Sequence, residues 1–295
     1  RLICEREIEI EKFNIEEYWS ISSNFLKNNN TKFSAKLIVL DGNKLKKLDI
    51  KNETEVNIAL QKIKDSNFKI KNIQTKRVKR NPLPPYTTST LQQDASNKLN
   101  FGASRTMSIA QKLYEGINIG TETTGLITYM RTDGVQLSKE SIDEIRNEIS
   151  NRHGENFVPQ IPRIYKSKAA NAQEAHEAIR PTSINRDPDS ISKYLDEEQK
   201  KLYELIWKRT ISSQMESAQL DETSADISNE DGSIMFRANG SQVHFQGFFI
   251  YRDREEDKIL PNLIENEDVI SDNPSGEQHF TQPPARYNDA SLVKK

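Results

Sequence analysis

The spacing of apolar residues changes twice along this chain, from alternation to helical spacing and back. Residues 33–86 and 218–270 carry apolar side chains at about every second position, which is typical of strands. Residues 87–217 carry them three and four positions apart, which is typical of amphipathic helices. The chain thus leaves a β-rich region and returns to it, so the two crossings must lie close together. We predict a multi-domain α and β protein, in which a helical domain (87–217) is inserted into a β-rich domain (33–86 and 218–270).

Turn and cap signals divide these regions into elements. Asp41-Gly42 predicts a hairpin between 36–40 and 45–50, and Asp231-Gly232 predicts another turn. The proline-rich stretch 81–86 cannot hold a helix and marks a boundary. Apolar spacing predicts a helix over 53–66, strands over 68–73, 223–227, 233–238 and 243–251, and helices with N-terminal caps at Ser89 with Gln92, at Ser138 or Ser141, and at Asp196. Residues 1–13 are expected to be the tail of a helix, and 253–268 a solvated acidic loop.

Composition excludes several classes of protein. The chain has 295 residues, with 42 lysines and arginines against 44 acidic residues, and its formal charge of −2 excludes a general polycation. No apolar run approaches the roughly 18 residues of a membrane-spanning helix. The one cysteine, Cys4, excludes internal disulfides and a multi-cysteine metal site, and the four histidines lack metal-ligand spacing. We expect a cytoplasmic protein without membrane contact, and a piece of a longer chain, because it starts without methionine.

The segment 125–134 joins a short apolar stretch to Tyr129, Arg131 and Asp133. In an extended segment, alternate side chains share a face, so Tyr129 and Arg131 should point the same way. A phenol ordinarily ionises near pH 10 and is a poor nucleophile. A guanidinium beside it would stabilise the phenolate and would hold the oxygens of a phosphoryl group. The alternative is a packing tyrosine beside a surface ion pair between Arg131 and Asp133.

The segment 171–181 places two potential cations four residues apart. Asn171 with Glu174 is a capping pattern, and Pro181 disfavours helix at the residue before it, which predicts a short helix. His176 and Arg180 would then share one face of that helix and would suit a phosphate. The alternative is a surface helix on which Glu177 pairs with the histidine.

Two further segments carry cations. Arg286 follows the rigid Pro283-Pro284 stretch and precedes a helix that Asn288 or Asp289 would cap, although the segment could also be a linker. A run of six lysines and arginines within 69–80 could follow a phosphate backbone. For that run, a solvated strand edge is the alternative.

Three of these segments together resemble the bacterial type IA DNA topoisomerases. Three motifs have the residues typical of that family and follow its order: Ile127–Asp133, Ala175–Pro181 and Pro283–Tyr287. Shorter matches at 5–9 and 88–93 extend the resemblance over essentially the whole chain. The chain is identified as a member of the family, in its topoisomerase I branch rather than among topoisomerase III or reverse gyrase, which share the tyrosine motif.

The resemblance implies a role for each matched residue. Tyr129 would attack a backbone phosphate of single-stranded DNA, leaving a 5′-phosphotyrosine and a free 3′-hydroxyl, so that resealing needs no ATP. Arg131 would position that phosphate, and His176 would assist through the neighbouring phosphate or through Asp133. The implied DNA-binding residues are Arg131, Asp133, Arg180 and Arg286. The family commonly has serine where Gly134 stands.

The resemblance also implies the gate fold of the family. The β-rich domain would be a hinge that lets the tyrosine-bearing helical domain swing, and 1–32 and 271–295 would be parts of a helical base domain. The family's Mg²⁺ ligands belong to a Toprim domain without a counterpart here. We therefore expect Mg²⁺ in the complete enzyme only, no metal ligand in this chain, and an inactive fragment. The implied partners are single-stranded and negatively supercoiled DNA, acted on by a monomer in the bacterial nucleoid.

Two other functions compete with this interpretation. A tyrosine recombinase also combines a tyrosine with histidine and arginine, but its His-x-x-Arg spacing and order fit 129, 176 and 180 poorly. A non-catalytic module that binds single-stranded DNA is the other, and covalent adduct formation would separate it from the enzyme.

Overall fold

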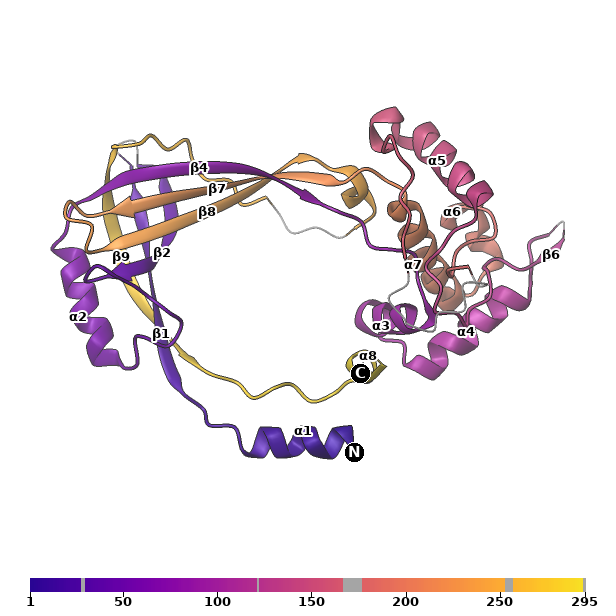
Figure 1. Cartoon of the computed structure of the whole chain (residues 1–295), viewed down its shortest axis with the longest axis horizontal. Coiled ribbons are helices and arrows are strands. Elements are labelled where there is room, and N and C mark those ends of the chain that lie inside the picture. The colour runs from indigo at the N-terminus through magenta and orange to yellow at the C-terminus, as the bar shows by residue number, and fades with distance from the viewer. Residues whose placement is uncertain (28–29, 121, 167–176, 253–256, 294–295) are drawn as a thin grey trace. The chain divides into compact units, whose positions relative to one another are not determined.

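The chain forms two units (Figure 1). The computed structural model describes residues 1–295 except 28–29, 121, 167–176, 253–256 and 294–295. The first unit, here called the β unit, comprises 1–78, 219–244 and 255–286. The second, the helical unit, comprises 79–218, 245–254 and 287–295. The chain therefore changes unit five times, where the apolar spacing predicted two crossings.

Seven strands form one sheet whose ends meet. Their order is β1 (Glu17–Leu26), β9 (Asp268–Phe280), β4 (Phe68–Arg80), β7 (Ala218–Ser228), β8 (Met235–Phe245), β2 (Lys32–Leu40) and β3 (Asn43–Lys44). Strand β1 pairs antiparallel with β9 on one side and with β2 on the other. Six strands thus close into a barrel, and only the two-residue β3 lies outside the ring.

Aromatic side chains fill this barrel. Phe25 packs against Phe33, Phe68 and Phe236 with ring centroids 5.2–5.9 Å apart, and all four rings are buried. The helix α2 (Glu53–Lys64) adds its buried face to the same core, with its N-terminus capped by Asn52. The alternating burial along β2 follows from this arrangement, because every second side chain enters the core.

The helical unit is built around α7 (Glu197–Ser213), which buries one long face. The helices α3 (Thr88–Leu99), α4 (Ala103–Glu115) and α6 (Pro188–Ile191) pack on it, as does the 3₁₀ helix Gly247–Tyr251. The remaining elements of this unit are α5 (Lys139–His153), the 3₁₀ helices Glu155–Phe157 and Ser192–Tyr194, the hairpin β5 (Ile117–Asn118) and β6 (Thr123–Thr124), and α8 (Asp289–Val293), which contacts α3. The helix α1 (Leu2–Glu11) belongs to the β unit and has no buried residue.

Arg163 ties together two segments through which the chain enters and leaves the helical unit. Its Nε donates to the carbonyl of Met215 (2.9 Å) and its Nη2 to the hydroxyl of Ser217 (2.7 Å). The Ser217 hydroxyl in turn donates to Oδ1 of Asn81 (2.7 Å). Residues near 81 and near 217 are therefore held side by side within this unit.

A third segment docks at the same place. The amide of Phe248 donates to the carbonyl of Glu216 (3.1 Å), and Gly247 lies directly against the backbone there. Gly247 has a φ of +48°, and a Cβ at this position would come within 3.0 Å of backbone atoms of Glu216 and Ser217. We call the segments 81–82, 213–217 and 247–248, together with Arg163, the clasp.

Most element predictions are confirmed. The helix over 53–66 is α2, the Asp41-Gly42 and Asp231-Gly232 turns join strands, and Ser138 and Asp196 cap α5 and α7. The cap of α3 is wrongly predicted, because Thr87 and Thr90 form its capping box and not Ser89 with Gln92. The predicted strands 45–50 and 243–251 are also wrong. No residue of 45–50 is in a strand, because β3 ends at Lys44 and irregular backbone and turns follow. The second predicted strand stops at Phe245, where the chain bends into the clasp.

The helix predicted over 1–13 is α1. Among the described residues of 1–32 and 271–295, helix occurs only in α1 and α8, while 17–26 and 268–280 are the strands β1 and β9 that close the barrel. Only Val269 is buried in β9, so its strand conformation comes from backbone pairing with β1 rather than from an apolar pattern. The acidic stretch before β9 is also more than a solvated loop, since Leu260 and Leu263 pack against the barrel core.

Candidate functional site

Tyr129 lies in an irregular segment whose side chains alternate between buried and exposed. Met130 and Thr132 are 4% and 6% exposed, whereas Tyr129 is 41% exposed and its neighbours Arg131 and Asp133 are exposed as well. Within the part of the chain that the structure describes, Arg131 makes no hydrogen bond or ion pair. The alternative of a packing tyrosine beside an Arg131–Asp133 ion pair does not fit this geometry.

The backbone before Tyr129 is fixed by residues 178–182. The amide of Thr128 donates to the carbonyl of Arg180 (2.9 Å), and its hydroxyl donates to the carbonyl of Ala178 (2.7 Å). The same hydroxyl accepts the amide of Arg180 (3.0 Å). Next to these bonds, Ile127 forms an isolated bridge with Pro181. Two extended segments from distant parts of the sequence therefore hold each other.

The backbone after Tyr129 is fixed by Thr88, the first residue of α3. The Thr88 hydroxyl donates to the carbonyl of Met130 (2.8 Å) and accepts the amide of Thr132 (2.8 Å). The Thr88 amide donates to the carbonyl of Thr132 (2.9 Å). The N-terminus of α3 thus lies against the tyrosine segment, and its partial positive charge favours an anion nearby.

A second exposed tyrosine lies beside Tyr129. The ring of Tyr114 packs edge-on against it, with centroids 5.5 Å apart and planes at 67°, and Tyr114 is itself 41% exposed. Tyr114 is in the last turn of α4, where the amide of Leu126 donates to the carbonyl of Leu113 (2.7 Å). Gly125 lies so close that a Cβ there would be 2.5 Å from the carbonyl oxygen of Tyr114.

The segment predicted as a helix over 171–181 is extended where the structure describes it. Residues 177–181 form isolated bridges with Tyr86 and Ile127, since their backbone groups find partners on both sides. His176 lies outside the described residues. Arg180 binds Glu177 through Nε (3.0 Å) and Nη2 (2.7 Å), and its side chain is 14% exposed. Glu177 also accepts the amide of Ser138 (2.8 Å), so Arg180 helps fix the start of α5.

Tyr86, whose side chain is buried, lies next to residues 177–181. Tyr86 is 1% exposed and donates to Oδ2 of Asp94 (2.5 Å), and Arg209 lies over its ring at 4.4 Å. Burial raises the pKa of Tyr86 far above its usual value. The Tyr86 carbonyl accepts the amide of Ile179 (2.8 Å). Tyr86 is therefore a neutral hydrogen-bond donor with a structural role. Unlike Tyr129, it is not accessible to a substrate.

Arg286 lies in the β unit, where it forms a bidentate ion pair with Glu7 of α1 (2.8 and 3.0 Å). Hydrogen bonding to Arg286 lowers the pKa of Glu7 below its usual value. The Arg286 side chain remains 74% exposed. Its guanidinium is thus accessible, but it has a carboxylate partner.

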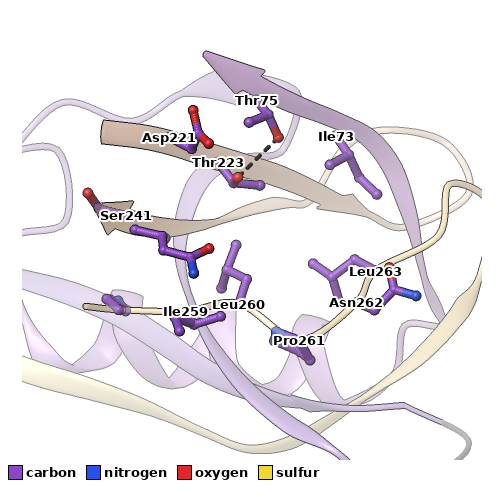
Figure 2. A pocket seen from close by; sticks show the side chains of 13 residues that line it. Ile73, Thr75, Asp221, Thr223, Ser241, Ile259, Leu260, Pro261, Asn262 and Leu263 are labelled. Atoms are coloured by element: carbon purple, nitrogen blue, oxygen red, sulfur yellow. Dashed lines mark hydrogen bonds between the residues drawn. The ribbon is translucent and has the colours of Figure 1, made fainter. Parts of the chain in front are cut away.

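The basic run within 69–80 lies in β4, whose neighbour β9 pairs only with Phe68 and Lys69, so the cations beyond Lys69 lie past that pairing and are exposed. Arg77 forms an ion pair with Asp221 (2.8 Å), and Lys69 with Asp268 (3.6 Å). Thr75 and Thr223 are hydrogen-bonded across the strands (3.0 Å), as Figure 2 shows. They line a cavity of about 230 Å³ that the loop 258–263 closes. None of the predicted site residues that the structure describes lines this cavity.

Neither a metal site nor a membrane span is found where the structure describes the chain. No group of three or more histidine, cysteine or acidic side chains among the described residues could hold a metal ion. The described residues therefore offer no set of ligands for the Mg²⁺ that the family resemblance implies for the complete enzyme. None of the described helices is both long and apolar enough to cross a bilayer.

Comparison with known proteins decides the family. A family model described as DNA topoisomerase matches residues 1–295. The chain belongs to the type IA DNA topoisomerase family. Similar proteins include DNA topoisomerase 1 of Rickettsia bellii, 52% identical over all of this chain and 38% of the relative, and DNA topoisomerase 1 of Xylella fastidiosa, 46% identical over all of this chain and 38% of the relative.

A solved topoisomerase has the same fold. The full-length topoisomerase I from Thermotoga maritima is 34% identical, with a TM-score of 0.82 over 99% of this chain and 45% of that one. The chain thus spans less than half the length of these type IA relatives. The predicted family and its gate fold are confirmed, and membership of this family excludes the tyrosine recombinase alternative.

Sequence patterns missed the residues that hold the site together. Thr88 and Thr128 fix the backbone on either side of Tyr129 through their hydroxyls, and Tyr114 lies against its ring. Both threonines lie in the matched segments 88–93 and 127–133, but the sequence does not show their role, because a hydroxyl that bonds a distant backbone looks like any surface threonine. Tyr114 continues the apolar spacing of Met107 and Ala110 along α4, so its sequence pattern predicts a packing residue and does not single it out.

Proposed function

We propose that this chain carries the nucleophile of an enzyme that relaxes negatively supercoiled DNA, without ATP, by cutting and resealing one strand. The observation that supports this best is the exposed pair Tyr129 and Arg131, on a segment whose intervening residues are buried and whose backbone is fixed on both sides. Exposure leaves the phenol open to a large substrate. Fixation holds it in one orientation, which a displacement at phosphorus requires.

In the proposed reaction, Oη of Tyr129 attacks a backbone phosphorus of single-stranded DNA. The Oη–P bond forms as the bond from phosphorus to the 3′ oxygen breaks. The phenol loses its proton, and the departing oxygen gains one to become a 3′-hydroxyl. The product is a 5′-phosphotyrosine, in which one phosphoester bond has replaced another. Resealing is the reverse reaction, so that no ATP is consumed.

Arg131 would bind the non-bridging oxygens of the attacked phosphate and stabilise the charge that develops there. The N-terminus of α3 beside the segment adds a favourable dipole. His176 is proposed to assist through the neighbouring phosphate or through Asp133. Arg286 would contact DNA by exchanging Glu7 for a phosphate, and the ion pair of Arg180 with Glu177 suits a supporting role better than a direct contact.

The division of the chain into two units supports a mechanical proposal. The β unit would act as the hinge, the helical unit would carry the tyrosine away to open the gate, and 1–32 and 271–295 would contribute to a base domain. Mg²⁺ would be held by a Toprim domain in the rest of the protein, because the described residues offer no ligand set. This chain alone is then inactive. The substrate is proposed to be single-stranded or negatively supercoiled DNA, and the enzyme a monomer of the bacterial cytoplasm, at the nucleoid.

The test uses the full-length protein that contains this chain. It is incubated with Mg²⁺ and a single-stranded oligonucleotide carrying a 3′ label, and adducts that resist SDS are counted. We expect Tyr129→Phe to abolish adducts and relaxation while DNA binding persists, because only the attacking oxygen is lost. Tyr114→Phe, the same change at the neighbouring ring, is the matched control and should keep both. Relaxation by Tyr129→Phe would overturn the proposal, and binding without any adduct in the wild type would favour the non-catalytic module.

A further inference from the structure

Tyr114 is an exposed aromatic ring at the edge of the packed face of α4. The buried side chains of α4 are Thr106, Ile109, Ala110 and Leu113, which form one stripe along the helix. Tyr114 follows Ala110 by four residues and so borders that stripe, yet it is 41% exposed and contacts the ring of Tyr129. Packing in the core therefore leaves much of this ring open to solvent beside Tyr129.

The exposure of Tyr114 does not come from a loose helix end. The amide of Leu126 bonds the carbonyl of Leu113 in the same turn, and Gly125 is pressed against the carbonyl of Tyr114 itself. Two residues separate Leu126 from Tyr129, and Thr128 and Thr88 fix that stretch further. The two rings thus form a pre-organised pair, at 5.5 Å and 67°, that faces solvent at the proposed point of attack.

The surroundings of Tyr114 favour a neutral, flat ligand over a phosphate. The ring stands at the C-terminal end of α4, where the helix dipole is negative, and the exposed Glu115 follows it. A phosphate would be repelled by both. An uncharged nucleobase would stack on the ring, since every base has a π face that an aromatic side chain accepts.

We infer that Tyr114 is a stacking platform for a nucleobase of single-stranded DNA next to the phosphate that Tyr129 attacks. The inference rests on the proposed function for the location of that phosphate. Stacking would anchor the strand beside the nucleophile, so Tyr114 is a binding residue and takes no part in bond breaking. This stacking role requires the aromatic ring of residue 114 and not its hydroxyl.

The test measures coupling between the ring and one base. The full-length protein is used in a Tyr129→Phe background, so that binding is measured without cleavage. Oligonucleotides around a cleavage site mapped with the wild type carry a single abasic residue at each of the neighbouring positions in turn. With Tyr114 present, we expect one abasic position to weaken binding by about 5- to 100-fold. Tyr114→Phe should show the same loss at the same position.

With Tyr114→Leu, which keeps a bulky side chain beside residue 129, intact DNA should bind as weakly as the abasic DNA does, and the abasic substitution should cost nothing more. If the abasic losses are the same with leucine as with tyrosine, the ring only supports Tyr129 and the inference is wrong. Adducts formed by Tyr129→Phe would overturn the proposed function instead. The coupling measurement would then stand on binding alone, so the two failures can be told apart.

Discussion

At the residue scale, hydroxyl groups do the positioning around Tyr129. Thr128 and Thr88 each both donate and accept, so each ties two backbone groups with one side chain. A hydroxyl is the smallest group that can do this, and it leaves room for the extended backbone on either side. These hydrogen bonds therefore hold the backbone of the exposed phenol in place, although it is not part of a regular strand.

Arg131 should matter to the rate more than to folding, because it is exposed and makes no ion pair within the described residues. We expect Arg131→Ala to slow single-turnover cleavage by about 10²-fold or more, the usual scale for losing a charge-stabilising donor. Arg131→Lys should retain part of the cleavage rate, because lysine keeps the positive charge but cannot form the two parallel hydrogen bonds of a guanidinium.

Arg105→Ala is the matched control for this prediction. Arg105 is an exposed arginine of α4 in the same unit, and its partner is Glu198. It should leave the cleavage rate nearly unchanged. Equal losses at 105 and 131 would mean that general charge, not a defined contact with the phosphate, explains the effect.

At the scale of elements, local signals predicted what local forces determine. Ser138 and Asp196 cap helices because their hydroxyl and carboxylate reach amides two or three residues on. The segment before Pro181 was predicted as a helix from the same kind of signal, yet it is extended in its described part. Its amides bond Gln136, Tyr86 and Thr128, none of which is near in sequence. Pairing with distant residues outweighs a cap, and spacing alone cannot show it.

The clasp is a second arrangement that no periodicity reveals, and Gly247 is its tightest point. We expect Gly247→Ala to destabilise the helical unit by about 1–3 kcal/mol more than Gly154→Ala does. Both glycines belong to the helical unit and have positive φ, but a Cβ at 154 meets only the exposed side chain of Asn156, whereas one at 247 meets the backbone of 216–217. Chemical denaturation followed by tryptophan fluorescence would measure the difference.

The tryptophan that reports on this change is Trp207 of α7, which packs against Tyr251 just beyond the clasp. Trp19 lies in the β unit, so a Trp19→Phe background isolates the signal. The same loss of stability at 154 and 247 would show that backbone strain, and not close packing, causes the effect of the alanine.

At the scale of the whole molecule, the chain has two cores, and each is assembled from separate stretches of sequence. Phe25→Ala should destabilise the β unit by about 3–5 kcal/mol, because it removes the ring that the other three phenylalanines contact. Hydrogen exchange followed by peptide should show lost protection in β1, β2 and β8, with α3, α5 and α7 unchanged.

The control for that experiment is Phe280→Ala, since Phe280 is in β9 of the same unit and is 52% exposed. Phe280→Ala should lower the stability of the β unit only slightly. Equal loss of protection in α7 with Phe25→Ala would mean that the two units unfold as one body.

The closure of the barrel has a mechanical consequence. Strand β1 begins and β9 ends at the same place, where the amide of Thr281 bonds the carbonyl of Glu16 and the register starts with Glu17 opposite Phe280. A pulling load applied through residues 16 and 281 would unzip this seam one residue pair at a time, toward Leu26 and Ile270. It would not shear all the pairs together. The force that opens the barrel along this seam is therefore set by single pairs and not by the length of the strands.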